Sequence, residues 1–174
     1  MMRSPSFRLL LVVARSIHVD TLFKKLLDSN VIEEIGLHAQ EAYPAEACGV
    51  LVREGDGLRS IRFENIQDKL HAIDPERFPR TSKTAYNMNT LKLHKLWENK
   101  TLEVIYHSHV EFGAYFSDED HAGALTPDTG EPVFPGVDYL VLSLMEQKPA
   151  AVGLFRFSKE SGRYDSVDGV ELSE

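Results

Sequence analysis

Apolar residues in the first quarter of the chain recur with the spacing of helices. Over Thr21–Tyr43 they return every three or four residues, which predicts a helical region. Asp20 stands where a helix N-cap is expected, and Ile17–Val19 ahead of it predicts a brief strand. Ser29-Asn30 would divide the region into two helices. Pro44 would end it, because a proline disfavours helical backbone in the preceding residue.

A continuous apolar stretch then predicts the buried part of a sheet. Residues Ala47–Val52 are apolar on both faces of an extended chain, which is typical of a central strand. The turn Glu54–Gly57 leads to a returning strand over Leu58–Phe63. The segment Asn65–Arg80 is polar and carries two prolines, so we expect a long loop there.

The second half of the chain predicts further strands and helices in alternation. In order, we expect a helix over Thr90–Lys100, a strand over Leu102–His109, a helix over Ser117–Leu125, a loop over Thr126–Gly136, and an antiparallel pair, Tyr139–Met145 and Ala150–Phe157, joined through Glu146–Pro149. Three or four helices with such strands predict the α/β class, of a mixed, α+β-like kind. We therefore expect a single domain with a central mixed sheet flanked by helices.

Composition and charge narrow the classes of function. The 174 residues are 43% hydrophobic and 26% charged, which is typical of a soluble globular protein. Lys and Arg total 19 against 27 Asp and Glu, a formal charge of −8. A nucleic-acid-binding surface needs a surplus of cations to displace the counterions of phosphate. We therefore expect no nucleic-acid partner.

The start of the chain and its cysteine content bear on location. The apolar run Leu9–Ala14, closed by Arg15, is shorter than the roughly 7–15 residues of a signal-peptide core and far shorter than the about 20 residues of a membrane span. The single cysteine, Cys48, excludes an internal disulfide and a cysteine-cluster metal site, and it favours a reducing compartment. The expected location is cytoplasmic, with no membrane partner.

Two histidines in the strand predicted over Leu102–His109 are the first chemical signal. Residues two apart in a strand point to the same face, so His107 and His109 present two imidazoles side by side. Asp120 follows eleven residues after His109, in the first turn of a predicted helix, and its carboxylate can return to the same point. Three such ligands leave the fourth corner of a zinc tetrahedron open for water, as in catalytic sites. The same ligand types also accept iron or cobalt.

The spacing of these residues carries more information than the histidine pair alone. A His-x-His pair arises by chance roughly 0.3 times in a chain of this composition, whereas requiring Ser117 and Asp120 at fixed offsets lowers that expectation to the order of one in a thousand. Ser117 and Asp120 also form a capping-box pattern, with Ser117 as the N-cap. The capping and catalytic roles are compatible, because an electropositive helix N-terminus favours an anion.

Glu46 is the candidate general base for such a site. It stands at the mouth of the central apolar strand, directly after Pro44-Ala45. A carboxylate at a strand end can equally face solvent, and that interpretation is favoured without the histidine motif. Beside the motif, the catalytic interpretation is favoured.

Together these residues resemble the JAMM (MPN+) zinc metalloprotease signature. The resemblance rests on Glu46 with Ala47–Leu51, then His107-x-His109, seven residues, Ser117, two residues and Asp120. The segment Phe134–Val141 is also similar to the small, stand-alone bacterial and archaeal members, and the likeness extends over Ile17 to Val167. Val110 departs from many relatives, which have proline there. We accordingly assign residues 17–174 to the metalloprotease domain and residues 1–16 to an N-terminal extension.

The resemblance implies one zinc ion per chain, held by His107, His109 and Asp120. It implies that Glu46 acts as general base and then as general acid, and that Ser117 hydrogen-bonds the oxyanion. The implied partner is a ubiquitin-like or sulfur-carrier protein, cleaved after its C-terminal Gly-Gly. The segments Asn65–Arg80 and Thr126–Gly136 would form the walls of a groove for that tail.

Two other functions remain open on the sequence alone. One is a deconjugating isopeptidase that releases a ubiquitin-like modifier from lysines of a target. The other is a catalytically silent scaffold of the same fold, although silent relatives typically lose ligands and this chain has the full set. A zinc deaminase would need a Pro-Cys-x-x-Cys element, which one cysteine cannot supply.

Overall fold

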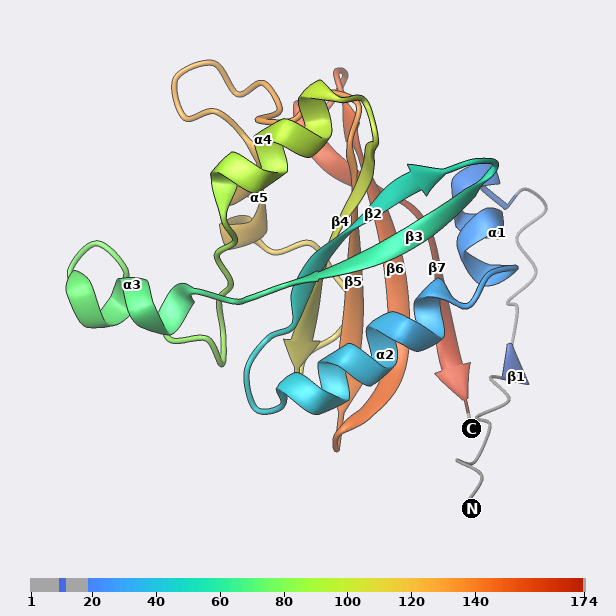
Figure 1. Ribbon diagram of the computed structural model, residues 1–174, viewed down its shortest axis with the longest axis horizontal. Helices are drawn as coiled ribbons and strands as arrows, with labels where there is room; N and C mark the ends of the chain where they lie inside the picture. The colour runs from blue at the N-terminus through green and yellow to red at the C-terminus, as the bar shows by residue number, and fades with distance from the viewer. Residues whose placement is uncertain (1–9, 12–18, 174) are drawn as a thin grey trace.

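The computed structural model describes residues 10–11 and 19–173, and these form one seven-stranded sheet with five helices (Figure 1). The strands are β1 (Leu10–Leu11), β2 (Cys48–Glu54), β3 (Gly57–Phe63), β4 (Leu102–Val110), β5 (Asp138–Met145), β6 (Lys148–Ser158) and β7 (Arg163–Ser173). The helices are α1 (Thr21–Leu27), α2 (Val31–Ala42), α3 (Gln67–Ile73), α4 (Thr90–Glu98) and α5 (Asp118–Ala124).

The sheet is mixed, with the strand order β1-β7-β6-β5-β4-β2-β3. All neighbouring strands are antiparallel except β4 and β5, which are parallel. A parallel pair requires a crossover connection, and here that connection contains α5. The crossover therefore carries α5 back over the sheet close to the end of β4.

Each face of the sheet is covered by its own apolar core. Because side chains alternate along a strand, Val104 and Tyr106 of β4 enter the core beneath α1 and α2, whereas Ile105 enters the opposite core. That second core packs the sheet against Leu93 of α4 and Ala124 of α5. The prediction of a mixed α/β domain with a central sheet flanked by helices is confirmed.

Most of the predicted elements are present at the predicted positions. Asp20 caps α1 by accepting hydrogen bonds from the backbone N–H groups of Leu22 and Phe23, and Ser29-Asn30 separates α1 from α2 as expected. Ile17 and His18 of the predicted first strand lie outside the described residues, as does the predicted extension apart from Leu10–Leu11, which pairs with β7.

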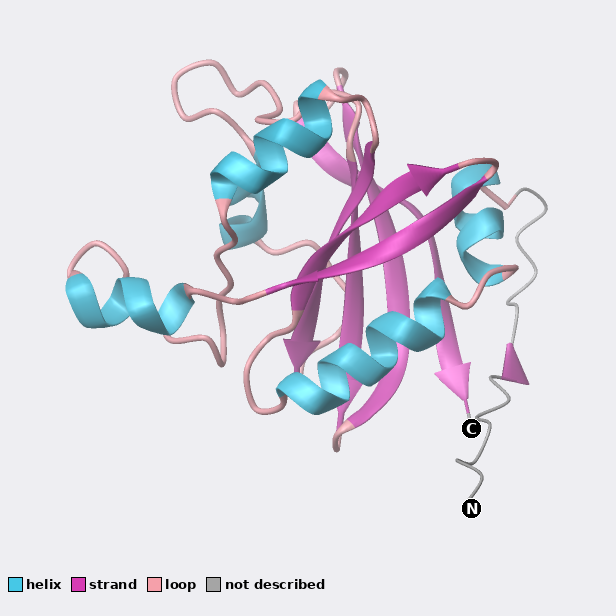
Figure 2. Cartoon of the chain, viewed as in Figure 1, coloured by secondary structure: helices cyan, strands magenta, loops and turns pink. Residues whose placement is uncertain are grey.

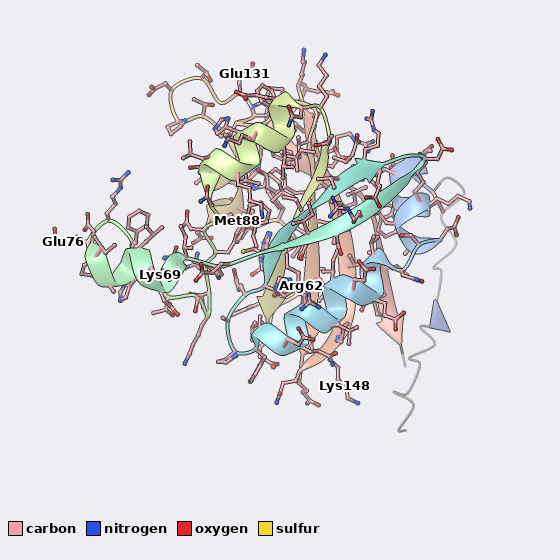
Figure 3. All side chains as sticks on the ribbon, viewed as in Figure 1. Arg62, Lys69, Glu76, Met88, Glu131 and Lys148 are labelled. Atoms are coloured by element: carbon pink, nitrogen blue, oxygen red, sulfur yellow. The ribbon has the colours of Figure 1, made fainter. Side chains whose placement is uncertain are left out.

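The expectation of a continuous loop over Asn65–Arg80 is wrong, because α3 lies within it and projects beyond the sheet (Figure 2). Figure 3 shows Lys69 and Glu76 on this projection, away from the sheet. Only Gln67 of α3 is buried. The helix is fixed by polar contacts rather than by an apolar face, so hydrophobic periodicity does not detect it.

The C-terminal half differs from the prediction in one additional strand and in the length of one turn. β7 was not expected, because only Tyr164 and Leu172 of its described side chains are buried and its pattern is largely polar. The predicted four-residue connection between β5 and β6 is shorter, since β6 begins at Lys148. Glu146 and Gln147 alone form the turn, both with positive φ, as in a tight type I′ hairpin.

Candidate metal centre

The end of β4 places two imidazoles on one face of the sheet. His107 and His109 follow Ile105 on the side of α4 and α5, and both are buried. Their Nε2 atoms lie 3.1 Å apart, and their ring centroids 5.0 Å apart. The pair predicted from the two-residue spacing therefore converges on one point.

The first turn of α5 adds a carboxylate to this pair. Asp120 Oδ1 lies 3.1 Å from His107 Nε2, and Asp120 Oδ2 lies 3.4 Å from His109 Nε2. These three residues form a group whose potential ligand atoms all lie within 4.8 Å of one another. The crossover between β4 and β5 is what brings Asp120 back over the strand.

The spacing of the two imidazole nitrogens fits a small tetrahedral cation. A tetrahedron with metal–ligand bonds of about 2.0–2.1 Å has ligand atoms about 3.3–3.4 Å apart. The separation of 3.1 Å between the two Nε2 atoms is close to that value, and each Nε2 atom has a different oxygen of Asp120 at 3.1 or 3.4 Å. Two imidazoles and one carboxylate are also a donor set that divalent transition metals accept. The group could therefore hold a metal ion.

The electrostatics of the group favour an ionised carboxylate. Burial raises the pKa of Asp120, but the adjacent His107 and hydrogen bonds from His107, His109 and Ser117 outweigh it and hold that pKa far below its usual range. Burial lowers the pKa of His107, against the opposing effect of Asp120. Burial acts in the same direction on His109, but its hydrogen bonds to Asp120 and Gly113 outweigh burial and raise its pKa, so a bound cation would take the place of a proton on that ring.

Neighbouring groups orient the two histidine rings differently. His109 Nδ1 lies 2.9 Å from the carbonyl oxygen of Gly113, so a proton on Nδ1 is donated there and the Nε2 lone pair faces the group. The ring of His107 is stacked on Tyr86, with centroids 4.4 Å apart. His107 Nδ1 is buried and has no hydrogen-bond partner among the described residues.

Ser117 and Asp120 form the predicted capping box. Ser117 Oγ accepts a hydrogen bond from the Asp120 backbone N–H at 3.1 Å, and the Ser117 backbone N–H and hydroxyl both donate to Asp120 Oδ2, at 2.8 and 2.7 Å. This pairing fixes the carboxylate that faces the histidines. It also means that the Ser117 hydroxyl proton is directed to Asp120 rather than toward a ligand.

Glu46 lies beside the same group because of the register between β2 and β4. Cys48 is paired with His107, and Glu46 stands two residues earlier on the same face. Its side chain is 6% exposed. Burial raises the pKa of Glu46 to about 7, with Asp120 also raising it and His109 and Arg80 lowering it. The three predicted regions, which contain Glu46, the two histidines, and Ser117 with Asp120, thus meet at one place.

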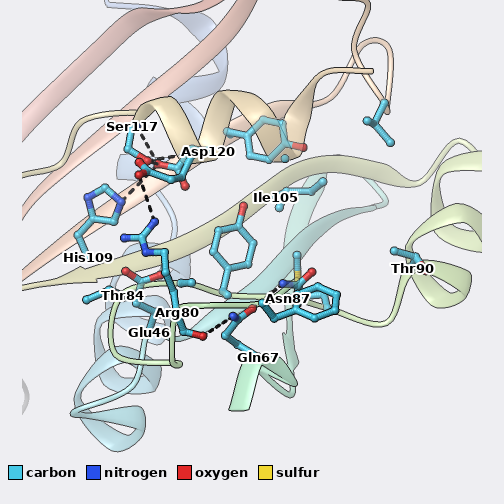
Figure 4. A pocket seen from close by; sticks show the side chains of 18 of the residues that line it. Glu46, Gln67, Arg80, Thr84, Asn87, Thr90, Ile105, His109, Ser117 and Asp120 are labelled. Atoms are coloured by element: carbon cyan, nitrogen blue, oxygen red, sulfur yellow. Dashed lines mark hydrogen bonds and ion pairs between the residues drawn. The ribbon is translucent and has the colours of Figure 1, made fainter. Parts of the chain in front are cut away.

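A cleft of about 460 Å³ opens over these residues, and Glu46, His109, Ser117 and Asp120 line it (Figure 4). One wall is built from the segment after α3, including Phe78 and Arg80, and another from Val133 and Phe134 of the loop between α5 and β5. Both segments expected to flank a groove therefore line this cleft.

Three residues that complete the site were not predicted from the sequence. They are Tyr86 on the face of His107, Gly113 at His109 Nδ1, and Arg80 within the cleft. All three lie in connecting segments without hydrophobic periodicity. Their positions depend on tertiary contacts, and no local signal in the sequence could have identified them.

Comparisons with known proteins find a matching family model and similar solved structures. A family model described as "Prokaryotic homologs of the JAB domain" matches residues 28–150. The solution structure of protein DSY2949 from Desulfitobacterium hafniense is 25% identical, with 79% of this chain and 85% of that chain covered and a TM-score of 0.52. A solution structure from Salinibacter ruber is 21% identical over 80% of this chain and 86% of that chain, with a TM-score of 0.49. No curated protein matches the chain.

Proposed function

This chain belongs to the family of prokaryotic homologs of the JAB domain, and we propose that within that family it is an active zinc-dependent peptidase. Its substrate would be a ubiquitin-like or sulfur-carrier protein, cleaved after a C-terminal Gly-Gly. The family includes metallohydrolases, and this chain has a compact His-His-Asp group suited to a metal. In the part of the chain that the structure describes, no helix is long and apolar enough to cross a membrane. The expected cytoplasmic location stays a prediction.

The observation that carries the proposal is the burial of Glu46 in the cleft that is also lined by His109 and Asp120 of the His-His-Asp group. A carboxyl group with a pKa near 7 can take a proton and return it at neutral pH. A silent scaffold has no need of this arrangement, because burying an ionisable side chain costs free energy. The position of Glu46 therefore favours hydrolysis over a scaffold role.

The proposed reaction assigns a role to the metal ligands, to Glu46 and to Ser117. Zinc, when held by His107, His109 and Asp120, supplies Lewis acidity that makes water a better nucleophile at neutral pH. Glu46 accepts the proton of the attacking water and later donates it to the leaving amine, so that the amide C–N bond breaks and the proton count balances. Ser117, whose hydroxyl donates to Asp120 in the free protein, would turn to the oxyanion of the tetrahedral intermediate.

The test is a metal analysis combined with cleavage of small Gly-Gly-ended proteins that carry C-terminal extensions. We expect about one zinc ion per chain, and we expect product masses that correspond to cleavage directly after Gly-Gly. A chelator should abolish the reaction and added zinc should restore it. The Glu46→Gln variant should keep the metal and lose cleavage, because the amide retains the shape of the side chain and cannot accept the proton.

The controls separate the proposed roles from a general loss of structure. His107→Ala should lose the metal, whereas His38→Gln on α2, beyond the opposite face of the sheet, should keep both metal and activity. Cleavage at the normal rate by Glu46→Gln would remove Glu46 from the mechanism. Full metal occupancy with no cleavage of any Gly-Gly substrate would instead favour the scaffold.

A further inference from the structure

Arg80 places a positive charge inside the cleft, and its backbone lies in the wall formed by the segment after α3. Arg77 and Arg80 are the arginines that line the cleft among the described residues. The guanidinium of Arg77 lies over the ring of Phe78, 5.3 Å from its centroid. The side chain of Arg80 instead extends from near Glu46 toward Ser117 and Asp120 (Figure 4).

Hydrogen bonds to buried groups hold the backbone around Arg80 against the site. The side chain of Gln67, only 3% exposed, donates to the Arg80 carbonyl at 2.6 Å. Two residues later, the Ser82 backbone N–H and hydroxyl both donate to Asp68, at 2.7 and 2.6 Å. The Ser82 carbonyl in turn accepts the backbone N–H of Glu46 at 2.7 Å. Arg80 therefore starts from a fixed position next to the proposed general base.

The guanidinium already has a carboxylate partner, but a weakly held one. Arg80 Nη1 lies 3.5 Å from Glu119 Oε1, and the two side chains are 41% and 65% exposed. An ion pair this exposed contributes little to stability. A guanidinium offers a planar fork of donors that matches a carboxylate, so a second carboxylate entering the cleft would compete with Glu119 for it.

We propose that Arg80 binds the free α-carboxylate of the segment released by cleavage, and that Glu119 occupies this position until substrate displaces it. This inference rests on the proposed peptidase function. It assigns the chain to trimming short C-terminal extensions from a carrier, because the lysine of an isopeptide substrate has no free carboxylate near the scissile bond. The deconjugating alternative thus becomes an outcome of the test.

The binding experiment uses two peptide analogues ending in Gly-Gly-Ala, one with a free α-carboxylate and one with an α-amide. In both, the bond after Gly-Gly is replaced by a methylene-amine that cannot be hydrolysed, and their affinities for the zinc-loaded protein are measured by fluorescence anisotropy. We expect the acid to bind about tenfold more tightly than the amide, as a charge-assisted hydrogen bond allows. Arg80→Gln should reduce that ratio to near one.

The two members of the ion pair should respond in opposite directions. Glu119→Gln removes the internal competitor and should tighten binding of the acid a few-fold. If the ion pair were purely structural, Arg80→Gln and Glu119→Gln would both weaken binding of the acid. Arg59→Gln is the matched control, because Arg59 pairs with Glu54 on the distant β2–β3 hairpin and should keep the wild-type ratio. Circular dichroism of each variant checks that it is folded.

The results distinguish this inference from the peptidase proposal. Equal or undetectable binding of the two analogues by the wild-type protein would overturn the role of Arg80. An equal decrease in affinity for the acid in Arg80→Gln and Glu119→Gln would overturn it as well. If the preference for the acid holds but the hydrolysable peptide with a free carboxylate is not cleaved, the peptidase proposal fails and carboxylate recognition stands. Preferential cleavage of a lysine-linked isopeptide would favour deconjugation.

Discussion

Two carboxylates within one cleft are driven toward opposite protonation states. Glu46 is buried, and burial raises its pKa to about 7 against the smaller lowering effects of His109 and Arg80. Asp120 is also buried, but His107 and the hydrogen bonds of the capping box overcome that effect and lower its pKa. This separation suits one carboxylate for moving a proton and the other for binding a cation.

The stability of the metal-free protein should depend on pH because the Glu46 carboxyl is buried. Its pKa rises on folding from 4.5 to about 7, so the folded state binds more protons than the unfolded state between those values. Ionised Glu46 therefore opposes folding increasingly as pH rises through this window, by up to about 3 kcal/mol above pH 7. With a chelator present, Glu46→Gln should increase the free energy of unfolding at pH 8 and have little effect at pH 4.

Urea unfolding at the two pH values measures this difference directly. The control is Glu54→Gln, which changes an exposed carboxylate that pairs with Arg59 on the β2–β3 hairpin. This variant should not show a comparable increase in the free energy of unfolding at pH 8. An identical effect of Glu46→Gln at both pH values would contradict a raised pKa for this carboxyl.

The residues of the metal group could be predicted because their geometry is largely local. The period of a strand places His107 and His109 on one face, and the capping pattern places Asp120 in the first turn of α5. Arg80 is different, since its position depends on a hydrogen bond from the side chain of Gln67 to its carbonyl, and no apolar periodicity marks that contact. The positions of site residues that depend on secondary structure can be predicted from the sequence, whereas positions that depend on the packing of loops cannot.

At the scale of elements, buried apolar strands can be predicted from the sequence, whereas polar elements cannot. β2 and β4 are apolar through most of their length, and their positions follow from the sequence. β7 and α3 are held by backbone pairing and polar contacts, so their side chains give no comparable pattern. The elements that position the metal group belong to the predictable class.

The contact between β2 and β4 depends on a glycine. A Cβ atom on Gly49 would lie 2.4 Å from the Ile61 carbonyl oxygen and 2.5 Å from the Tyr106 ring and hydroxyl. Tyr106 crosses this position to reach His38 Nδ1 on α2, at 2.8 Å from its hydroxyl oxygen. Gly49→Ala should therefore destabilise the protein by about 1–3 kcal/mol, as expected for overpacking.

Thermal unfolding compares this variant with Gly57→Ala in the same hairpin. A Cβ atom on Gly57 would come no closer than 3.7 Å to its nearest neighbour, the Glu54 carbonyl, and its φ is not positive. This control should be close to neutral. Equal melting temperatures for the Gly49 and Gly57 variants would show that the sheet relaxes around the added methyl group.

At the scale of the whole molecule, the metal group joins parts of the chain that are distant in sequence. His107 and His109 lie in the sheet, Asp120 lies in the crossover that covers one face, and Glu46 leads into β2 from the segment after α2. A cation shared by β4 and α5 would link the sheet to its covering layer. Binding of the metal to the folded state alone should therefore stabilise the domain as a unit.

Zinc should raise the melting temperature of the chelator-treated protein. At a free concentration 100-fold above the dissociation constant, a ligand that binds only the folded state adds about 2.7 kcal/mol. For a domain of this size that corresponds to an increase of about 5–10 °C. Because His107→Ala removes a ligand and Asp120→Asn weakens another, both variants should lose most of the increase, whereas His38→Gln should retain it. If zinc gave the same increase in His107→Ala as in the wild-type protein, the ion would bind elsewhere, and the convergence of β4 and α5 would not be a metal site.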